Sequence, residues 1–146
     1  MSNSLERIKE LFLFDIIVAT QKIRYIAKDF EKGEDLKYSF KDWDTIVREF
    51  EIVGEAMRYC LNYKLFNEEK DKRAVIDFRN VLIHKYFGID ADEVLNIAKK
   101  NLDWLDSIVV NRINKIEESY KQKLIKYMIE ENSYLDFVVD RLKALK

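Results

Sequence analysis

The chain has 146 residues, of which 48% are hydrophobic and 36% charged, enough apolar material for the core of one domain. Its 26 basic and 27 acidic residues nearly cancel, which excludes a strongly basic nucleic-acid-binding surface over the whole molecule. The single cysteine excludes an internal disulfide and a cysteine-based zinc site, and three glycines with no proline favour an all-helical chain.

The first predicted helix is amphipathic and long. Apolar residues recur at steps of three and four from Leu5 to Phe30. The run "LFLFDIIVA" is the most apolar stretch of the chain, but Asp15 interrupts it and it is too short to span a bilayer. No segment resembles a signal peptide, so we expect a cytoplasmic protein with no membrane association.

Two further helices are predicted after a polar connection. The segment "EKGEDLKYS" is expected to be that connection, and Ser39 followed by Asp42 marks the start of a second helix that runs to about Phe66. The third predicted helix spans Glu69 to Tyr86, and Gly88 is its expected C-terminal stop.

A fourth helix is expected to begin at Asp90. The helical pattern then breaks near Asn132, and Ser133 with Asp136 can start a short last helix. The predicted fold class is all-α: an up-and-down four-helix bundle over residues 1–110, with residues 111–146 as a helical C-terminal extension of the same domain.

The third predicted helix places a charged residue on its apolar side. With about 100° per residue, Phe78 and Leu82 flank Arg79 on a helical wheel. The only histidine, His84, lies roughly 140° away, on a polar stripe that includes Asn80. Arginine keeps its charge, so a buried arginine needs a partner.

The second predicted helix carries a polar stripe that repeats at the same spacing, and its members include Arg48, Glu51 and Glu55. Two such stripes facing each other would form a polar seam or the wall of a cleft, so we expect Glu51 or Glu55 to contact Arg79 or to line the same cleft. The simpler alternatives are a solvated, salt-bridged face, an arginine that reaches past apolar neighbours to water, and a surface histidine. No metal-ligand cluster, glycine-rich phosphate loop or nucleophile motif is visible.

Two segments together resemble one known family. Arg79, His84 and Tyr86 form the pattern R-x4-H-x-Y, and the segment "RNVLIHKYFGID" is similar along its whole length to the signature of the HEPN superfamily. In particular it resembles the HepT-type toxins, which are paired with a nucleotidyltransferase antitoxin of the MntA type. The segment "REFEIVGEA", Arg48 to Ala56, resembles the second helix of that family, and the resemblance covers roughly residues 5–110.

The resemblance implies a metal-independent ribonuclease toxin that needs no cofactor and forms a homodimer with a shared RNA cleft. His84 would transfer protons, Arg79 would hold phosphate, and Asn80 would orient the imidazole or bind phosphate. Tyr86 would accept AMP from the nucleotidyltransferase antitoxin, which would silence the enzyme. The supporting side chains of the cleft would be Arg48, Glu51 and Glu55.

Two other classes of function stay open at this stage. The chain could be a non-catalytic helical binding module that docks a nucleotidyltransferase, or a dimeric bundle without chemistry. RNA cleavage by the purified protein separates the ribonuclease from both.

Overall fold

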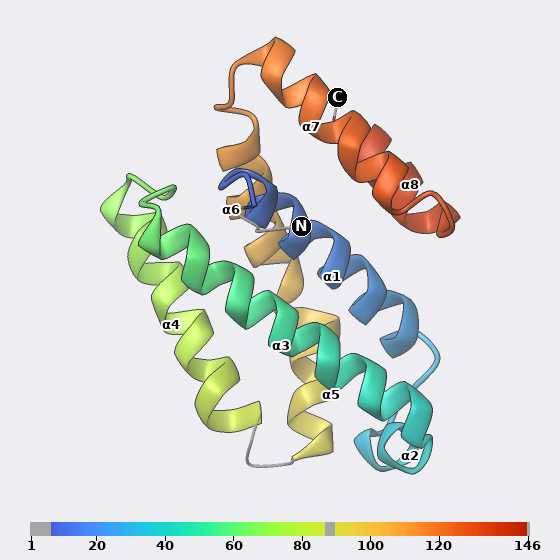
Figure 1. Ribbon diagram of the computed structural model, residues 1–146. Coiled ribbons are helices and arrows are strands. Elements are labelled where there is room, and N and C mark those ends of the chain that lie inside the picture. The colour runs from blue at the N-terminus through green and yellow to red at the C-terminus, as the bar shows by residue number, and fades with distance from the viewer. Residues whose placement is uncertain (1–6, 87–89, 146) are drawn as a thin grey trace.

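The computed structural model describes residues 7–86 and 90–145, with the side chains of residues 83–86 left aside (Figure 1). These residues form helices and no strands, which confirms the predicted all-α class. The helices are α1 (Leu11–Ala27), α2 (Gly33–Tyr38), α3 (Phe40–Asn62), α4 (Glu69–Tyr86), α5 (Ala91–Lys100), α6 (Leu102–Ile113), α7 (Glu118–Glu131) and α8 (Asp136–Lys143). None of them combines the length and the apolar composition that a membrane crossing requires.

Helix α1 lies at the centre of the fold. Ten of its 17 residues are buried, and they point to more than one side of the helix. A helix that is apolar on several sides must be covered on several sides. Helices α3, α5, α6 and α8 provide that cover, and Figure 1 shows α1 between α3 and the α7–α8 pair.

Helix α3 packs one apolar face on α1. Its buried face includes residues spaced by three and four positions: Ile46, Phe50, Val53, Met57 and Cys60. Burial raises the pKa of the Cys60 thiol to about 12, so this cysteine is the inert core residue that the sequence predicts. Helix α4 packs against the other side of α3 and buries Val75, Phe78 and Leu82.

The connection predicted after the first helix contains a helix of its own, α2. Leu36 of α2 is fully buried, and the backbone N–H of Gly33 donates to Asp92 Oδ1 over 2.8 Å. A Cβ at position 33 would lie 2.2–2.6 Å from backbone atoms of Ala91 and Asp92. Only glycine permits this approach of α2 to the start of α5.

Some helix boundaries agree with the sequence, but α1 begins at Leu11 rather than near Leu5 and α3 ends at Asn62 rather than near Phe66. Helix α4 has the predicted bounds, and the Asp90 side chain caps α5 by accepting from two backbone N–H groups. The predicted fourth helix is divided at Asn101 into α5 and α6. Asparagine interrupts helices because its amide competes for backbone hydrogen bonds. The expected stop at Gly88 lies outside the described residues.

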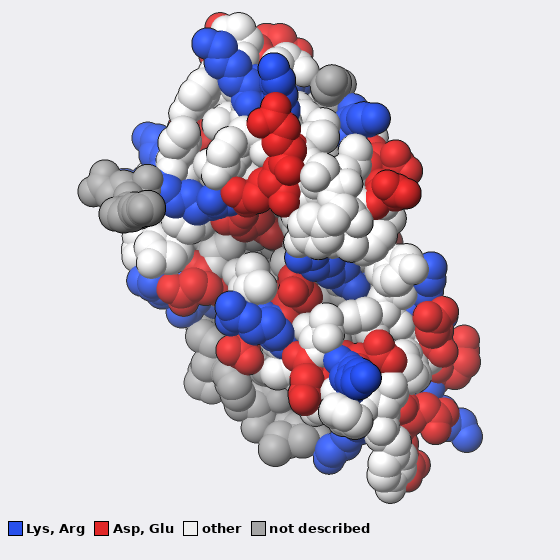
Figure 2. Space-filling model, turned by 45° about the vertical axis from the view of Figure 1, so that its right-hand side comes forward, with Lys and Arg blue, Asp and Glu red and all other residues white. Residues whose placement is uncertain are grey.

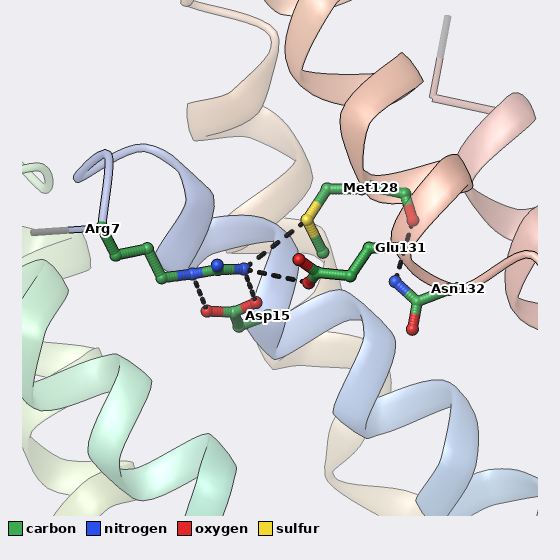
Figure 3. A network of polar contacts seen from close by, with 5 residues as sticks. All are labelled: Arg7, Asp15, Met128, Glu131 and Asn132. Carbon is green, nitrogen blue, oxygen red and sulfur yellow. Dashed lines mark hydrogen bonds and ion pairs between the residues drawn. The ribbon is translucent and has the colours of Figure 1, made fainter. Parts of the chain in front are cut away.

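The C-terminal extension folds back along α1 as the pair α7 and α8. Arg7 joins it to the rest of the protein: its guanidinium donates two hydrogen bonds to Asp15 of α1, at 2.9 and 2.7 Å, and reaches Glu131 of α7 at 3.5 Å (Figure 3). On α8, Arg141 pairs with Asp106 of α6 at 2.7 Å. These polar contacts hold the extension on the face of α1 away from α4 (Figure 1).

Two carboxylates lie close to this junction, Asp15 half-buried and Glu49 buried. Burial raises the pKa of Asp15, although the hydrogen bonds from Arg7 act in the opposite direction. Burial also raises the pKa of Glu49, only partly opposed by the positive charges of Lys22 and Arg48. A carboxyl whose folded-state pKa is raised binds its proton more tightly when folded. Its contribution to stability is therefore present below the unfolded pKa and is lost as the pH rises through the folded pKa.

We expect Glu49→Gln to raise the free energy of unfolding at pH 7 by on the order of 1 kcal/mol, because the neutral amide removes a buried charge. The gain should shrink below about pH 4, where the carboxyl is protonated in both states. Urea unfolding at both pH values measures this. Asp44→Asn, on the exposed side of α3, is the matched control and should change stability by less than about 0.5 kcal/mol. A Glu49→Gln variant less stable than wild type at pH 7 would contradict the assignment.

Candidate active site

Helix α4 places Arg79 at the boundary between its buried and exposed sides. Phe78 and Leu82 on either side are buried, Asn80 is exposed, and Arg79 itself is half-buried. This is the position that the helical wheel predicts. A guanidinium there can pair inside the protein and still meet a ligand from solvent.

The partner of Arg79 is a backbone carbonyl of α3. Arg79 Nε donates to the oxygen of Gly54 over 3.3 Å. The two terminal nitrogens of the guanidinium make no hydrogen bond within the described part of the chain. The arginine is therefore oriented by one bond while most of its donors stay available to a ligand.

Gly54 leaves open space next to this bond. A Cβ built at Gly54 would meet no atom within 4 Å. A glycine inside a long helix costs roughly 1 kcal/mol relative to alanine, so α3 gives up stability at the point where Arg79 reaches it.

Glu55 follows Gly54 and adds a negative charge near the guanidinium. The hydrogen bond from Arg58 lowers the pKa of the Glu55 carboxyl, and the charges of Arg58 and Arg79 lower it further. Glu55 therefore lies in the electrostatic field of Arg79, while its direct partner is Arg58 on its own helix. We expected Glu51 or Glu55 to contact Arg79. The hydrogen bond that the structure shows goes from Arg79 to the Gly54 carbonyl instead.

Arg48 and Glu51 lie on the side of α3 that faces α1. With Glu55 they line a hollow of about 180 Å³ whose other wall includes Phe12 and Asp15. Neither Arg48 nor Glu51 forms a hydrogen bond or ion pair with Arg79 among the residues that the structure describes. Of the three predicted supporting residues, Glu55 is the one that the structure brings under the influence of Arg79.

The other predicted site residues lie on the last turns of α4. His84 follows Asn80 by one helical turn, and Tyr86 is the final residue of the helix. Their side chains are outside those that the structure describes. Asn80 is exposed.

The surface charge and the possible metal-ligating side chains limit which ligands the protein can bind. On the face shown in Figure 2, basic and acidic side chains are interspersed, so no continuous basic field covers it. Within residues 7–86 and 90–145, no group of three or more His, Cys, Asp or Glu side chains is arranged to hold a metal ion. Of the predicted catalytic side chains on α4, those that the structure describes are the guanidinium of Arg79 and the amide of Asn80.

Gly54 is the site residue that the charge pattern did not predict as a partner. A charge-based search looks for a carboxylate, whereas the structure uses a main-chain oxygen that every residue has. The signal in the sequence was the glycine itself, which has no conformational reason to stand in the middle of α3.

Comparison with known proteins identifies the family of this chain. Residues 1–112 match the family described as "Ribonuclease HepT-like". "Putative RNase MJ1380" of Methanocaldococcus jannaschii is 33% identical over 94 residues, which are 62% of this chain and 84% of that protein. "Probable ribonuclease HepT" of Thermococcus cleftensis is 29% identical over 92 residues, 62% of this chain and 83% of that protein.

A third relative, also from Methanocaldococcus jannaschii, is named "Gamma-glutamylcyclotransferase and putative RNase MJ0434" and is 26% identical over 119 residues. The matched part covers 51% of that longer protein. No solved structure matches this chain significantly. The match over residues 1–112, with both segments around Arg79 and Gly54 inside it, shows that the chain belongs to the HepT-like ribonuclease family.

Proposed function

We propose that this protein is a metal-independent endoribonuclease, the toxin of a toxin–antitoxin pair, and that AMP transfer to Tyr86 silences it. The observation that carries the proposal is Arg79, a half-buried guanidinium that one bond to Gly54 orients and whose terminal nitrogens bond to no described residue. Family membership supports RNA as the substrate. The site can bind a phosphate group, since a guanidinium holds two phosphate oxygens at once.

The proposed reaction is attack of a ribose 2′-oxygen on the adjacent phosphorus. The 2′-O–P bond forms, the bond from phosphorus to the 5′-oxygen breaks, the 2′-hydroxyl gives up its proton, and the 5′-oxygen receives one. His84 carries the proton transfer because histidine titrates near neutral pH. Arg79 stabilises the charge that builds up on the phosphorus oxygens, and Asn80 orients the imidazole or the phosphate.

One histidine per chain supports a site built from two subunits, since proton removal and proton donation would then use His84 of both copies. Helices α4 and α6 also leave large apolar side chains more than one third exposed: Ile76, Val81 and Trp104. A second subunit would cover them. The proposed assembly is therefore a homodimer with its cleft along α4.

Arg79→Ala should reduce RNA cleavage by at least about 100-fold, the scale of removing one donor that stabilises a developing charge. Far-UV circular dichroism should stay helical, because the lost hydrogen bond to Gly54 contributes only about 1 kcal/mol. Arg73→Ala, exposed on the same helix, is the matched control and should cut normally. Arg79→Lys keeps the charge without the planar fork and should remain well below wild type. Wild-type cleavage by Arg79→Ala would refute its role.

His84→Ala should lower the cleavage rate by about 100-fold or more and should also remove the dependence of the rate on pH between about 5 and 8. The rate against pH, measured with a short fluorescent RNA, tests this. A variant that is slower but keeps the wild-type pH profile would show that His84 positions the RNA rather than transferring protons. Wild-type protein that binds a nucleotidyltransferase but leaves RNA intact would favour the non-catalytic binding module.

Light scattering at micromolar concentration should give twice the 17.6 kDa mass of the chain. Val81→Glu should produce a monomer that no longer cuts RNA, because a charge would be buried at the proposed interface. Tyr38→Glu, at a strongly exposed residue of α2, is the control and should stay dimeric and active. Full cleavage activity in a monomeric Val81→Glu protein would remove the two-subunit site.

Tyr86→Phe should remain an active ribonuclease but resist silencing by the nucleotidyltransferase, because it lacks the hydroxyl that accepts AMP. Tyr86 follows Arg79 by seven residues, about two helical turns, so an attached phosphate lies on the same side of α4 as the guanidinium and competes with RNA. Mass spectrometry of co-expressed wild type should locate AMP on the peptide that contains Tyr86. Tyr63→Phe is the control and should still be silenced. AMP found on Tyr63, or full silencing of Tyr86→Phe, would contradict this assignment.

A further inference from the structure

A second polar site lies on the other side of α3, between α1, α3 and α7. It is a hollow of about 240 Å³ whose carboxylates come from three different helices: Asp15, Glu49 and Glu131. Figure 3 shows how two of them, Asp15 on α1 and Glu131 on α7, approach each other through Arg7. Asp15 also borders the hollow of Arg48, Glu51 and Glu55, whereas Glu49 and Glu131 line only this second one among the described residues.

Glu49 is the unusual member of the hollow. The residue is only 7% exposed, yet within the described chain its carboxylate has no hydrogen bond and no ion pair. Lys22 and Arg48 are near enough to influence its charge, but neither forms an ion pair with it. A buried carboxylate without a partner is costly, so its retention at the wall of an open hollow indicates a ligand.

The hollow exists because of the C-terminal extension. Its third wall is formed by Met128, Glu131, Asn132 and Tyr134, which all lie beyond residue 112, where the family match ends. The amide of Asn132 donates to the Met128 carbonyl over 2.9 Å, which fixes the end of α7 at this wall (Figure 3). Without the extension Glu49 would face solvent, so burial of this carboxylate is a feature of the longer chain.

The lining determines the charge of the ligand. Three carboxylates and one lysine, Lys22, line the hollow. Arg7 pairs with Asp15 and Glu131, which leaves Glu49 as the carboxylate of the lining that has no ion pair among the described residues. A cation is therefore complementary to the hollow, whereas an RNA phosphate would be repelled by Glu49. Between the charges the lining is aliphatic, with Val18, Ala19 and Ile52. A charged head on a methylene stem matches that combination.

We propose that this hollow is a docking site for a partner protein, and that it receives an arginine or lysine side chain of that partner, which pairs with Glu49. The aliphatic lining packs on the stem of the basic side chain. Tyr134, 71% exposed at the rim, packs against the neighbouring residue of the partner. The site is separate from the ribonuclease chemistry, so the proposal does not depend on RNA cleavage.

The test uses the full chain and two N-acetylated, C-amidated pentapeptides with leucines flanking the central residue. One peptide has arginine at the centre, and the other has citrulline, which keeps the shape without the charge. Titration followed by NMR of backbone amides and of ¹³C-labelled carboxyl groups should show saturable binding of the arginine peptide with a dissociation constant on the order of 1 mM. The shifts should be confined to α1, α3 and α7 and should include Glu49. The citrulline peptide should bind at least about tenfold more weakly.

Glu49→Gln should weaken binding of the arginine peptide about tenfold, while Asp44→Asn, on the exposed side of the same helix, should leave it unchanged. Because Glu49→Gln is expected to be the more stable protein at pH 7, unfolding cannot explain its loss of binding. Equal binding by Glu49→Gln and wild type, equal binding of both peptides, or no binding at all would overturn the proposal. Shifts at the same residues on adding an RNA oligonucleotide instead of the peptide would overturn it as well.

Discussion

Burial of helix α1 is the constraint on which the rest of the structure depends. Its apolar residues point to several sides, so the helix is stable only when α3, α5, α6 and α8 surround it. Each of these neighbours then turns a different face outward. Most polar side chains of the protein lie on the helix faces and edges that do not pack on α1.

Helix α3 shows the consequence most clearly, because it presents polar groups on two sides. At Gly54 its backbone carbonyl orients the half-buried guanidinium of Arg79 of α4. On the side that faces α7, Glu49 is buried against α1 without an ion pair or hydrogen bond to any residue that the structure describes. Both features cost stability, one through a glycine inside a helix and the other through a buried charge. Proteins tolerate such costs mainly where a ligand or a reaction needs them.

The parts of the fold that follow from local signals could be predicted. The bounds of α4, the Asp90 cap and the break near Asn132 each depend on residues close in sequence. Helix α2 could not be predicted, because its six residues are held by burial of Leu36 and by the contact of Gly33 with α5, nearly sixty residues away. The sequence indicated that Arg79 needs a partner, but a backbone partner such as the Gly54 carbonyl leaves no trace in a charge pattern. Burial of Glu49 depends on α7, which is far from it in sequence, so no local pattern predicts it.

The central claim is that residues of α4 catalyse attack of the ribose 2′-oxygen without a metal ion. The most direct test is to incubate the purified protein with a short RNA in EDTA and to analyse the ends of the products. Attack by the 2′-oxygen predicts cleavage in EDTA, with a 2′,3′-cyclic phosphate on one product and a 5′-hydroxyl on the other. Cleavage that requires added magnesium and leaves a 3′-hydroxyl and a 5′-phosphate would contradict the account, because those ends come from attack by water rather than by the 2′-oxygen.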